Sequence, residues 1–360
     1  MLKYTFFVLK VTFIGHEASR TGAPILLLKM LENLPDTEFD ININLLKGGP
    51  LENKYAKYRK RFFGKPDLFY LHSHSYSFLS KAKAMGVPVI CHVLEDKISF
   101  QQLPPNILEI FKSYPIHYVV VSDHIKKLLC NEFGIPEEKI SMIRTGIDLS
   151  EWKIPSQMEM QKFRDGIGIP SDTLIIGGAG QIHPRKGVDL WLQTAYQLKK
   201  ILPEQKLHFV WVGGEAEGES IYNLLLQEDV ERSALRGAVS FVGEVTNPKS
   251  YFSLFDVFLL TSRQEPSGTV ILENALLQKP VITLEAAGGA TELAEQGWVR
   301  LVPGIDTLAM AQEIKLIFES DSLRHEITKK GREIVLNEYD VRKTALQVAQ
   351  IIKSHALITV

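Results

Sequence analysis

Cysteine is nearly absent from this chain, and so are the signals of secretion or membrane insertion. Only two cysteines occur in 360 residues, Cys91 and Cys130, and they form no Cys-x-x-Cys pair. This scarcity argues against a disulfide framework or a zinc site and is typical of a reducing compartment. The apolar run at residues 4–15 is interrupted by Lys10 and is too short to span a bilayer, and no small-residue cleavage site follows it. We therefore expect a soluble, cytoplasmic protein.

An excess of charge of either sign is also missing. The chain has 41 lysines and arginines against 42 aspartates and glutamates, for a formal net charge of -1 and a pI near 6.8. Such a balance gives no bulk electrostatic attraction to nucleic acid or to an anionic surface. We expect no nucleic-acid partner.

One local exception is the segment from Lys54 to Lys65, in which six basic residues alternate with aromatic ones. A basic, aromatic segment fits contact with an anionic membrane or with a phosphorylated acceptor. The alternative is a solvated helix face. On the first interpretation the protein is peripheral at the inner face of the membrane.

Alternating strand and helix patterns fill both halves of the chain. With 45% hydrophobic residues, the chain is long enough for two cores. Repeated alternation predicts an α/β protein with two parallel, doubly wound sheets facing across a cleft. A polar, proline-containing stretch at residues 152–160 predicts the linker. Strands are predicted at residues 10–15, 39–46, 67–71, 88–92, 118–122, 139–143, 174–178, 207–212, 239–243, 255–260 and 281–284.

The central stretch, residues 261–280, carries two carboxylates at the start of a predicted helix. The helix is expected to begin near Ser267 and to end before Pro280, with Glu265 just ahead of it and Glu273 inside it. A rise of about 1.5 Å per residue places the two carboxylates on the order of 10 Å apart. The helix N-terminus between them offers N–H groups to an anion. A diphosphate between two hydroxyl-binding carboxylates describes a nucleotide sugar.

Other loops carry residues of matching chemistry. Gly22 separates a strand from a helix and lets the backbone approach a ligand, although an ordinary tight turn fits as well. Arg185 and Lys186 are candidate cations for the same anion, with a solvated loop as the alternative. His92 ends a predicted strand at the edge where ligands gather in parallel sheets, and a structural histidine is the alternative.

Taken in order, these motifs carry a family resemblance. The chain resembles the retaining GT-B glycosyltransferases of the bacterial group that includes the phosphatidylinositol mannosyltransferases and sucrose synthase, collinearly over residues 10–350. The matching features are the Gly22 loop, His92, VSDHIKK, RTGID, PRKG, VGG, the two glutamates of the central stretch, and Gly288, Gly289 and Glu292.

The resemblance implies a GT-B fold of two Rossmann-like domains. Residues 1–153 would form the acceptor-binding domain, residues 154–338 the donor-binding domain, and residues 339–360 a helix that crosses back to the first domain. The implied reaction moves a sugar from a nucleotide-diphosphate donor to a hydroxyl of a glycan or lipid-linked acceptor, with retention, in cell-surface polysaccharide assembly. No cofactor or metal is expected, and the chain contains no Asp-x-Asp sequence.

The resemblance also implies roles for individual residues. Glu273 would bind the ribose hydroxyls, because a carboxylate has two acceptor oxygens. Glu265, His92 and Lys186 would be catalytic: Glu265 and His92 beside the sugar, and Lys186 on the diphosphate leaving group. The implied donor-binding residues are Gly22, Gln181, Arg185, Lys186, Ser267, Gly268, Thr269, Val270 and Glu273.

Two positions depart from the family pattern. Gln181 stands where many relatives have an arginine, and Arg185 is the candidate replacement for that cation. Pro266 replaces a glycine and removes one backbone donor. Two alternative functions stay open: a sugar phosphorylase or nucleotide-sugar epimerase on the same fold, or a non-catalytic nucleotide-sugar-binding partner.

Overall fold

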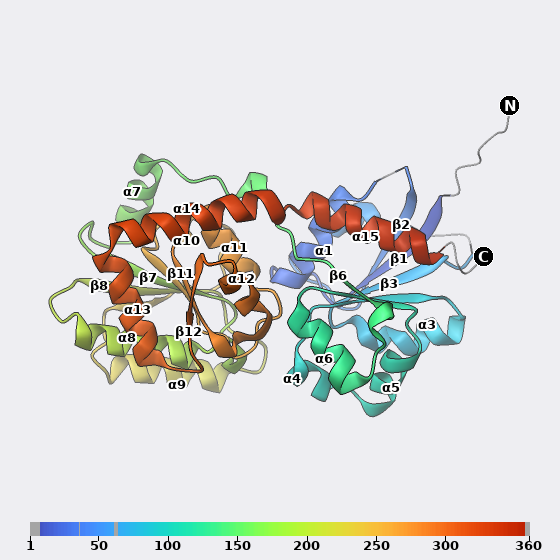
Figure 1. Ribbon diagram of the computed structural model, residues 1–360, viewed down its shortest axis with the longest axis horizontal. Coiled ribbons are helices and arrows are strands. Elements are labelled where there is room, and N and C mark those ends of the chain that lie inside the picture. The colour runs from blue at the N-terminus through green and yellow to red at the C-terminus, as the bar shows by residue number, and fades with distance from the viewer. Residues whose placement is uncertain (1–7, 36, 61–63, 357–360) are drawn as a thin grey trace. The chain divides into compact units, whose positions relative to one another are not determined.

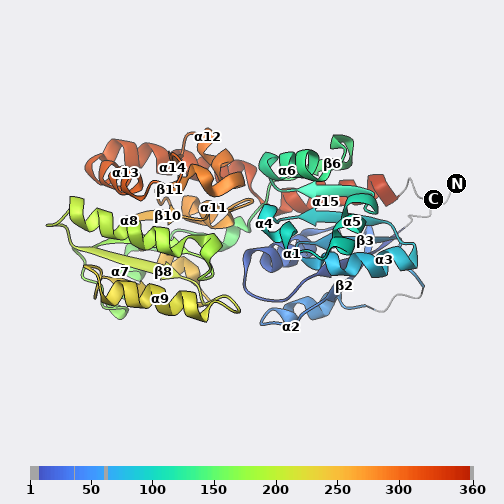
Figure 2. The same cartoon turned by 90° about the horizontal axis from the view of Figure 1, so that it is seen from below.

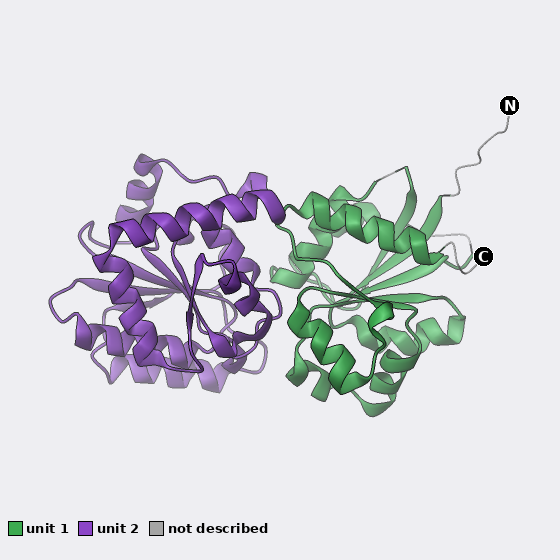
Figure 3. Cartoon of the chain, in the orientation of Figure 1, with its two compact units in different colours: residues 1–148, 339–360 green, residues 149–338 purple. Residues whose placement is uncertain are grey.

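The chain forms two compact units. The computed structural model describes residues 8–35, 37–60 and 64–356. Unit 1 comprises residues 1–148 and 339–360, and unit 2 comprises residues 149–338 (Figure 3). Unit 2 thus begins at Leu149 rather than at residue 154, and the Trp152 ring stacks on Phe252 within it, with ring centroids 5.9 Å apart. The stretch expected as a linker is helical from Gln157 onward, where Ser156 forms a capping box with Glu159.

Within its described residues, unit 1 contains a six-stranded parallel sheet in the order β2-β1-β3-β4-β5-β6. Every strand predicted for this half is confirmed to within a few residues, because buried β-branched and aromatic side chains mark each one. The strands are β1 (Leu9–Gly15), β2 (Phe39–Leu45), β3 (Leu68–His72), β4 (Val89–Val93), β5 (His117–Val120) and β6 (Ile140–Met142).

Helices cover both faces of this sheet. On one face α1 (Gly22–Asn33) packs beside α15 (Val341–Ala356), so the C-terminal helix belongs to unit 1 (Figure 1). The other face carries α3 (Leu79–Met85), α5 (Pro105–Ser113) and α6 (Asp123–Phe133). Helix α6 begins where Ser122 Oγ accepts a hydrogen bond from Ile125 N at 3.4 Å. Two short helices, α2 (Glu52–Tyr55) and α4 (Lys97–Gln101), lie in the connections.

Unit 2 repeats the plan. Its described residues form a parallel sheet in the order β12-β11-β10-β7-β8-β9. The strands are β7 (Leu174–Ala179), β8 (Leu207–Val212), β9 (Val239–Phe241), β10 (Val257–Leu260), β11 (Val281–Leu284) and β12 (Val299–Val302). Five of these were predicted and are confirmed, whereas β12 was missed because only its two end residues, Val299 and Val302, are buried, so it forms no continuous apolar run.

The helices of unit 2 again lie on two faces. Figure 2 shows α8 (Val188–Ile201) and α9 (Ser220–Glu231) along one face, and α8 also packs against α13 (Thr307–Glu319). On the other face α11 (Thr269–Leu276) packs against α14 (Asp321–Glu338). The remaining helices are α7 (Gln157–Gly166), α10 (Pro248–Phe252) and α12 (Glu292–Glu295). In the part of the chain that the structure describes, no helix combines the length and apolar character needed to cross a bilayer.

In both sheets the order in which the chain adds strands reverses near the middle. In unit 1 the chain winds from β1 toward β2 and then from β3 toward β6, so the strand order reverses between β1 and β3. In unit 2 the same reversal falls between β7 and β10. Loops that leave adjacent strands in opposite directions open a crevice at the carboxyl edge, and ligands of such sheets bind there. Each unit therefore offers one predicted ligand edge.

Candidate functional site

The reversal in the sheet of unit 2 brings Lys186 and Glu265 into direct contact. Lys186 follows β7 and Glu265 follows β10, and Lys186 Nζ donates a hydrogen bond to Glu265 Oε2. The side chains are only 14% and 11% exposed. Ser262 Oγ donates to the same carboxylate oxygen at 3.1 Å. The sequence predicted both residues as site residues, and the structure shows that they form one buried ion pair.

Burial and charge act in opposite directions on this pair. Burial tends to raise the pKa of Glu265, but the charges of Lys186 and Arg185 outweigh it, so the pKa lies below its ordinary value. Burial lowers the pKa of Lys186, against the attraction of Glu265. The site therefore holds a charged pair in a place where a free charge would be costly.

Arginines fix the two loops around the pair. Arg185 Nη1 donates to the backbone oxygen of Gln264 at 2.9 Å, and Arg263 N donates to Arg185 O at 2.8 Å. Arg263 also binds Asp189 through both terminal nitrogens, at 2.9 and 2.7 Å. The sequence analysis missed the Arg263–Asp189 pair. The available signal was the position of Arg263, three residues after the end of β10 and two before Glu265.

Gly268 ends the loop and caps helix α11. It has φ = 64°, in the left-handed region, and a Cβ at this position would lie 3.1 Å from Ile271 Cδ1. The helix starts at Thr269, close to the predicted start at Ser267. Its first N–H groups lack intrahelical partners, as at any helix N-terminus. Ser267, Thr269 and Val270 are partly exposed there, as a ligand-facing turn requires.

Glu273 lies inside α11, as predicted, and its carboxylate has no hydrogen bond or ion pair to any residue that the structure describes. The side chain is half-buried. Burial, and then the charge of Glu151, raise the pKa of Glu273 to about 8. An unpartnered carboxyl group at this depth is suited to accept hydrogen bonds from ligand hydroxyls.

The departures from the family pattern lie at the same edge. Gln181 is exposed in the loop after β7, and Pro266 is buried next to Glu265. Gly180, with φ = 136°, lies against the Lys186 stem, since a Cβ there would lie 3.3 Å from Lys186 Cδ. The glycine thus gives the lysine stem its path to Glu265.

Two predicted site residues belong to unit 1. Gly22 is exposed and is the first residue of α1, so it lies at the start of the helix and not in a separate loop ahead of it. His92 lies in β4 and is 1% exposed. Tyr70 OH and His92 Nδ1 are 2.9 Å apart, and His92 Nε2 has no partner among the described residues. Burial lowers the pKa of His92 to about 3. Contact of His92 with the sugar stays a prediction.

The basic segment is largely neutralised where it is described. Lys57, Arg59 and Lys60 each form an ion pair, with Glu32 at 3.7 Å, Glu52 at 2.8 Å and Asp40 at 3.1 Å, respectively. Tyr55 is buried and donates to the backbone oxygen of Pro24. Arg61, Phe62 and Phe63 lie outside the described residues.

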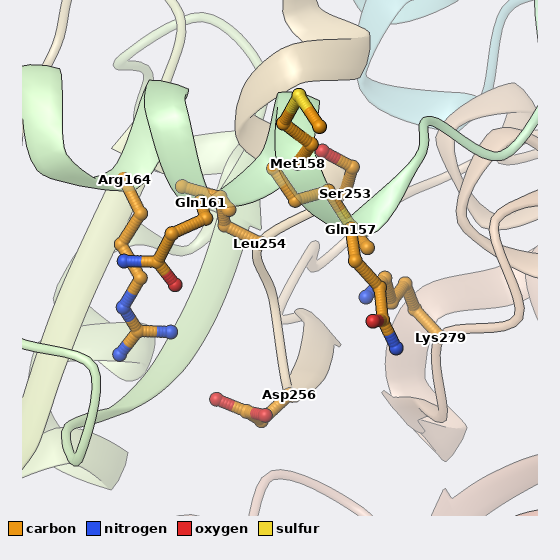
Figure 4. A pocket seen from close by; sticks show the side chains of 9 residues that line it. Gln157, Met158, Gln161, Arg164, Ser253, Leu254, Asp256 and Lys279 are labelled. Atoms are coloured by element: carbon orange, nitrogen blue, oxygen red, sulfur yellow. The ribbon is translucent and has the colours of Figure 1, made fainter.

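A separate pocket of about 560 Å³ lies at the opposite edge of unit 2. Asp256 precedes β10 and Lys279 precedes β11, so the pocket is at the amino ends of the strands (Figure 4). Arg164 borders it and donates to the backbone oxygens of Pro170 and Thr173. None of the predicted site residues lines this pocket.

Across the described ranges, no cluster of three or more histidine, cysteine, aspartate or glutamate side chains is placed to hold a metal ion.

Curated relatives align with part of this chain. An O-antigen biosynthesis glycosyltransferase of Escherichia coli, WclY, is 32% identical over 149 residues, 41% of this chain and 38% of its own length. The alpha-galactosylglucosyldiacylglycerol synthase of Streptococcus pneumoniae is 29% identical over 154 residues, 41% of this chain and 38% of its own. The aligned part of the chain therefore spans less than half the length of these relatives.

Solved structures match over nearly the whole chain and show the fold. Anabaena Alr3699/HepE in complex with UDP and glucose superposes with a TM-score of 0.83 at 21% identity, covering 96% of this chain and all of that one. WaaG, a glycosyltransferase involved in lipopolysaccharide biosynthesis, gives a TM-score of 0.72 at 14% identity, covering 95% and 99%. The predicted GT-B architecture of two doubly wound parallel sheets is confirmed.

Two family descriptions match the two units in turn. Residues 42–151 match Glycosyltransferase Family 4, and residues 173–320 match Glycosyl transferases group 1. The second match contains both loops of the Lys186–Glu265 pair, and together the matches cover more than half of the chain. Each unit therefore matches a glycosyltransferase family description over most of its length, on a fold shared with the GT-B glycosyltransferases.

Proposed function

We propose that this protein is a retaining, metal-independent glycosyltransferase that moves a sugar from a nucleotide-diphosphate donor to a hydroxyl of a glycan or lipid-linked acceptor. The observation that carries the proposal is the buried Lys186–Glu265 pair beside the N-terminus of α11, with the unpartnered Glu273 carboxyl inside that helix. Lys186 and the N-terminus of α11 would bind the diphosphate of the donor, and Glu273 would bind its ribose.

The chemistry asked of Lys186 is neutralisation of charge on the leaving group. When the bond between the anomeric carbon and the diphosphate oxygen breaks, both electrons stay on the oxygen, and the diphosphate gains negative charge. Lys186 is held at the site by Glu265, and Arg185 lies next to it in the chain. A cation that is already desolvated and positioned needs little reorganisation as that charge develops. This arrangement supports neutralisation by side chains and a helix terminus in place of a metal ion.

Glu273 is assigned to the nucleoside. A carboxylate accepts two hydroxyl hydrogen bonds at once, which suits the paired hydroxyls of a ribose. Those bonds favour the charged form, so donor binding is expected to lower the pKa of Glu273 from its raised value. Proton release on binding is the measurable consequence.

The relatives support uridine nucleotides and polysaccharide assembly as the context. Anabaena HepE is described in complex with UDP and glucose, and WclY with O-antigen biosynthesis. A capsular polysaccharide biosynthesis glycosyltransferase of Staphylococcus aureus, CapM, aligns at 24% identity over 225 residues, 61% of this chain and 57% of its own length. We assign this chain to cell-surface polysaccharide biosynthesis at the cytoplasmic side, with peripheral membrane contact through Lys54 to Lys65 as a further proposal.

A donor-binding screen tests the proposal. Purified protein is titrated by calorimetry with UDP-, GDP-, ADP-, CMP- and dTDP-sugars in the presence of EDTA. We expect one nucleotide to bind selectively, and we expect Glu273→Gln to weaken that binding. Lys162→Ala, at an exposed position on α7, is the matched control. Absence of binding to every donor, or binding only when EDTA is omitted, contradicts the proposal.

The stereochemical part has its own test. NMR of the product formed with an α-linked donor is expected to show an α-linked glycoside. A β-linked product contradicts retention and leaves the donor-binding assignment untouched.

A further inference from the structure

The reversal in the sheet of unit 1 also gathers polar side chains, and no role has been given to them so far. β1 pairs with β3 so that Gly15 faces His72, and β3 pairs with β4 so that His72 faces His92. The residues that follow these three strands therefore meet at one carboxyl edge. They are His16 and Glu17 after β1, Ser73 and His74 after β3, and Leu94 and Glu95 after β4.

Ser73 holds a strained conformation at this edge. Its φ is +57°, and among the described residues only Gln278 shares a positive φ without being glycine. Such a conformation costs about 1–3 kcal/mol and persists where surrounding contacts enforce it. Ser73 N donates to the backbone oxygen of His92 at 2.9 Å, and its hydroxyl donates to Glu95 Oε1 at 2.6 Å. These two bonds fix the turn that presents His74.

Glu95 is a buried anchor for this turn. It is 2% exposed, and it accepts hydrogen bonds from Ser73 Oγ, from Tyr76 OH and from its neighbour Leu94 N at 3.1 Å. His74 Nε2 lies 3.7 Å from Glu95 Oε1. Because its oxygens already have donors inside the protein, Glu95 acts by orienting His74.

The exposed part of the cluster is a pair of imidazoles. The rings of His16 and His74 are 5.5 Å apart in an edge-on arrangement. The His74 side chain is 51% exposed and that of His16 is 22% exposed. Burial lowers the pKa of His16, and the charge of His74 lowers it further. The charges of Glu17 and Glu95 oppose this shift without reversing it. A neutral imidazole has one hydrogen-bond donor and one acceptor nitrogen. It can therefore either donate to a hydroxyl group or accept from one.

The charges around the pair select the ligand class. Glu17 lies 3.4 Å from His16 Nε2 and Glu95 lies behind His74, so an anion would meet two carboxylates. A metal ion would need three ligands placed together, and the described residues offer no such group. A neutral ligand rich in hydroxyl groups meets neither obstacle.

We propose that His16 and His74 form a hydroxyl-binding subsite for the acceptor glycan, with Glu95 as the positioning residue that orients His74 through the Ser73 turn. The inference rests on the proposed transferase function and names the residues of unit 1 that would hold its acceptor. It also accounts for the strained backbone of Ser73, since the turn that contains Ser73 holds the His74 imidazole at the surface.

The test observes the imidazoles directly. NMR signals of the histidine ring carbons are followed in the full-length protein with UDP present, during titration with the methyl glycosides of glucose, galactose and N-acetylglucosamine. His16→Asn and His74→Asn assign the signals. His325, exposed on α14 in unit 2, is the internal control. We expect saturable shifts of His16 and His74 with at least one glycoside and no shift of His325.

Two variants separate binding from positioning. His74→Asn should abolish the response of His16, because half of the subsite is gone. Glu95→Gln should weaken glycoside affinity about tenfold, because loss of the charged anchor costs about as much as one charge-assisted hydrogen bond. Since Glu95 is buried, the half-exposed His74 variant keeps the test valid if Glu95→Gln does not fold.

The outcomes are distinct from those that bear on the donor site. No shift of His16 and His74 with any glycoside, or a shift that His325 shares, overturns the inference while UDP-sugar binding stands. Loss of UDP-sugar binding with intact histidine shifts contradicts the donor assignment instead. UDP-glucose calorimetry on the same samples separates the two cases.

Discussion

Lys186 Nζ is bound to Glu265 Oε2 at the point where two loops of unit 2 meet, and neither side chain is more than 14% exposed. An ion pair at such depth is weak evidence for stability, because desolvation offsets most of the attraction. The pair lies at the carboxyl edge of the sheet, where ligands bind. Because the pair contributes little to stability and lies at this edge, we assign it to function.

Removing one partner of this pair should cost both stability and activity. Lys186→Met leaves the Glu265 carboxylate buried and unpaired, which typically costs about 3–5 kcal/mol in free energy of unfolding. The double variant Lys186→Met/Glu265→Gln should recover most of that stability, because no lone charge remains. Urea denaturation measures both variants.

Activity should not follow stability in that series. Loss of one group that stabilises developing charge typically lowers kcat about 100- to 1,000-fold, so the double variant should stay inactive although it is stable. A stable double variant with wild-type turnover would remove Lys186 from the reaction.

Glu273 should make stability fall as pH rises. Its pKa is about 8 in the folded protein against an ordinary value of 4.5, so between these pH values the folded state binds more protons than the unfolded state. Stability from this group is therefore complete below about pH 4.5 and is lost as pH rises toward 8. Denaturation curves across this window should show a smaller slope against pH in Glu273→Gln than in the wild type. Equal slopes would show that the carboxyl group is not desolvated.

His92 should act in the opposite direction. Burial lowers its pKa to about 3 from 6.5, so between these values the unfolded state binds the extra proton. Stability contributed by the neutral ring is present above pH 6.5 and is lost as pH falls toward 3. His92→Gln should reduce the loss of stability in acid relative to the wild type, measured by thermal denaturation. If the two proteins respond to acid identically, the ring is solvated in solution.

Gly268 should tolerate no side chain. Alanine at φ = 64° is strained, and its Cβ would meet Ile271 at 3.1 Å, so Gly268→Ala should destabilise the protein by more than about 1 kcal/mol. The shifted start of α11 should also weaken UDP-sugar binding. Gly134→Ala, at φ = 66° with nothing within 4 Å of the added Cβ, controls for backbone strain alone. Donor affinity equal to that of the control variant would show that the α11 N-terminus does not contact the donor.

The sequence predicted the alternation of strands and helices well, because central parallel strands such as Val281–Leu284 are short, fully buried apolar runs. It also placed Glu265 before α11 and Glu273 inside it, since glycine, a polar start and helical spacing act locally. The sequence did not predict contacts between loops that are distant in the chain, because these contacts depend on the tertiary fold. The Lys186–Glu265 bond joins residues 79 positions apart, and the strained Ser73 turn depends on Glu95, 22 positions away. For His92 the sequence left a ligand contact and a structural histidine both open, because its burial depends on neighbouring strands that are distant in the chain.

Turnover tests the central claim most directly. The purified protein is incubated with the UDP-sugar that binds best, with EDTA and with lipid-linked and glycan acceptors, and both UDP release and the glycosylated product are measured. The account predicts UDP release matched by product, with EDTA present, and its loss in Lys186→Met/Glu265→Gln. Donor binding without turnover, or donor consumption that requires inorganic phosphate in place of a hydroxyl acceptor, would contradict it.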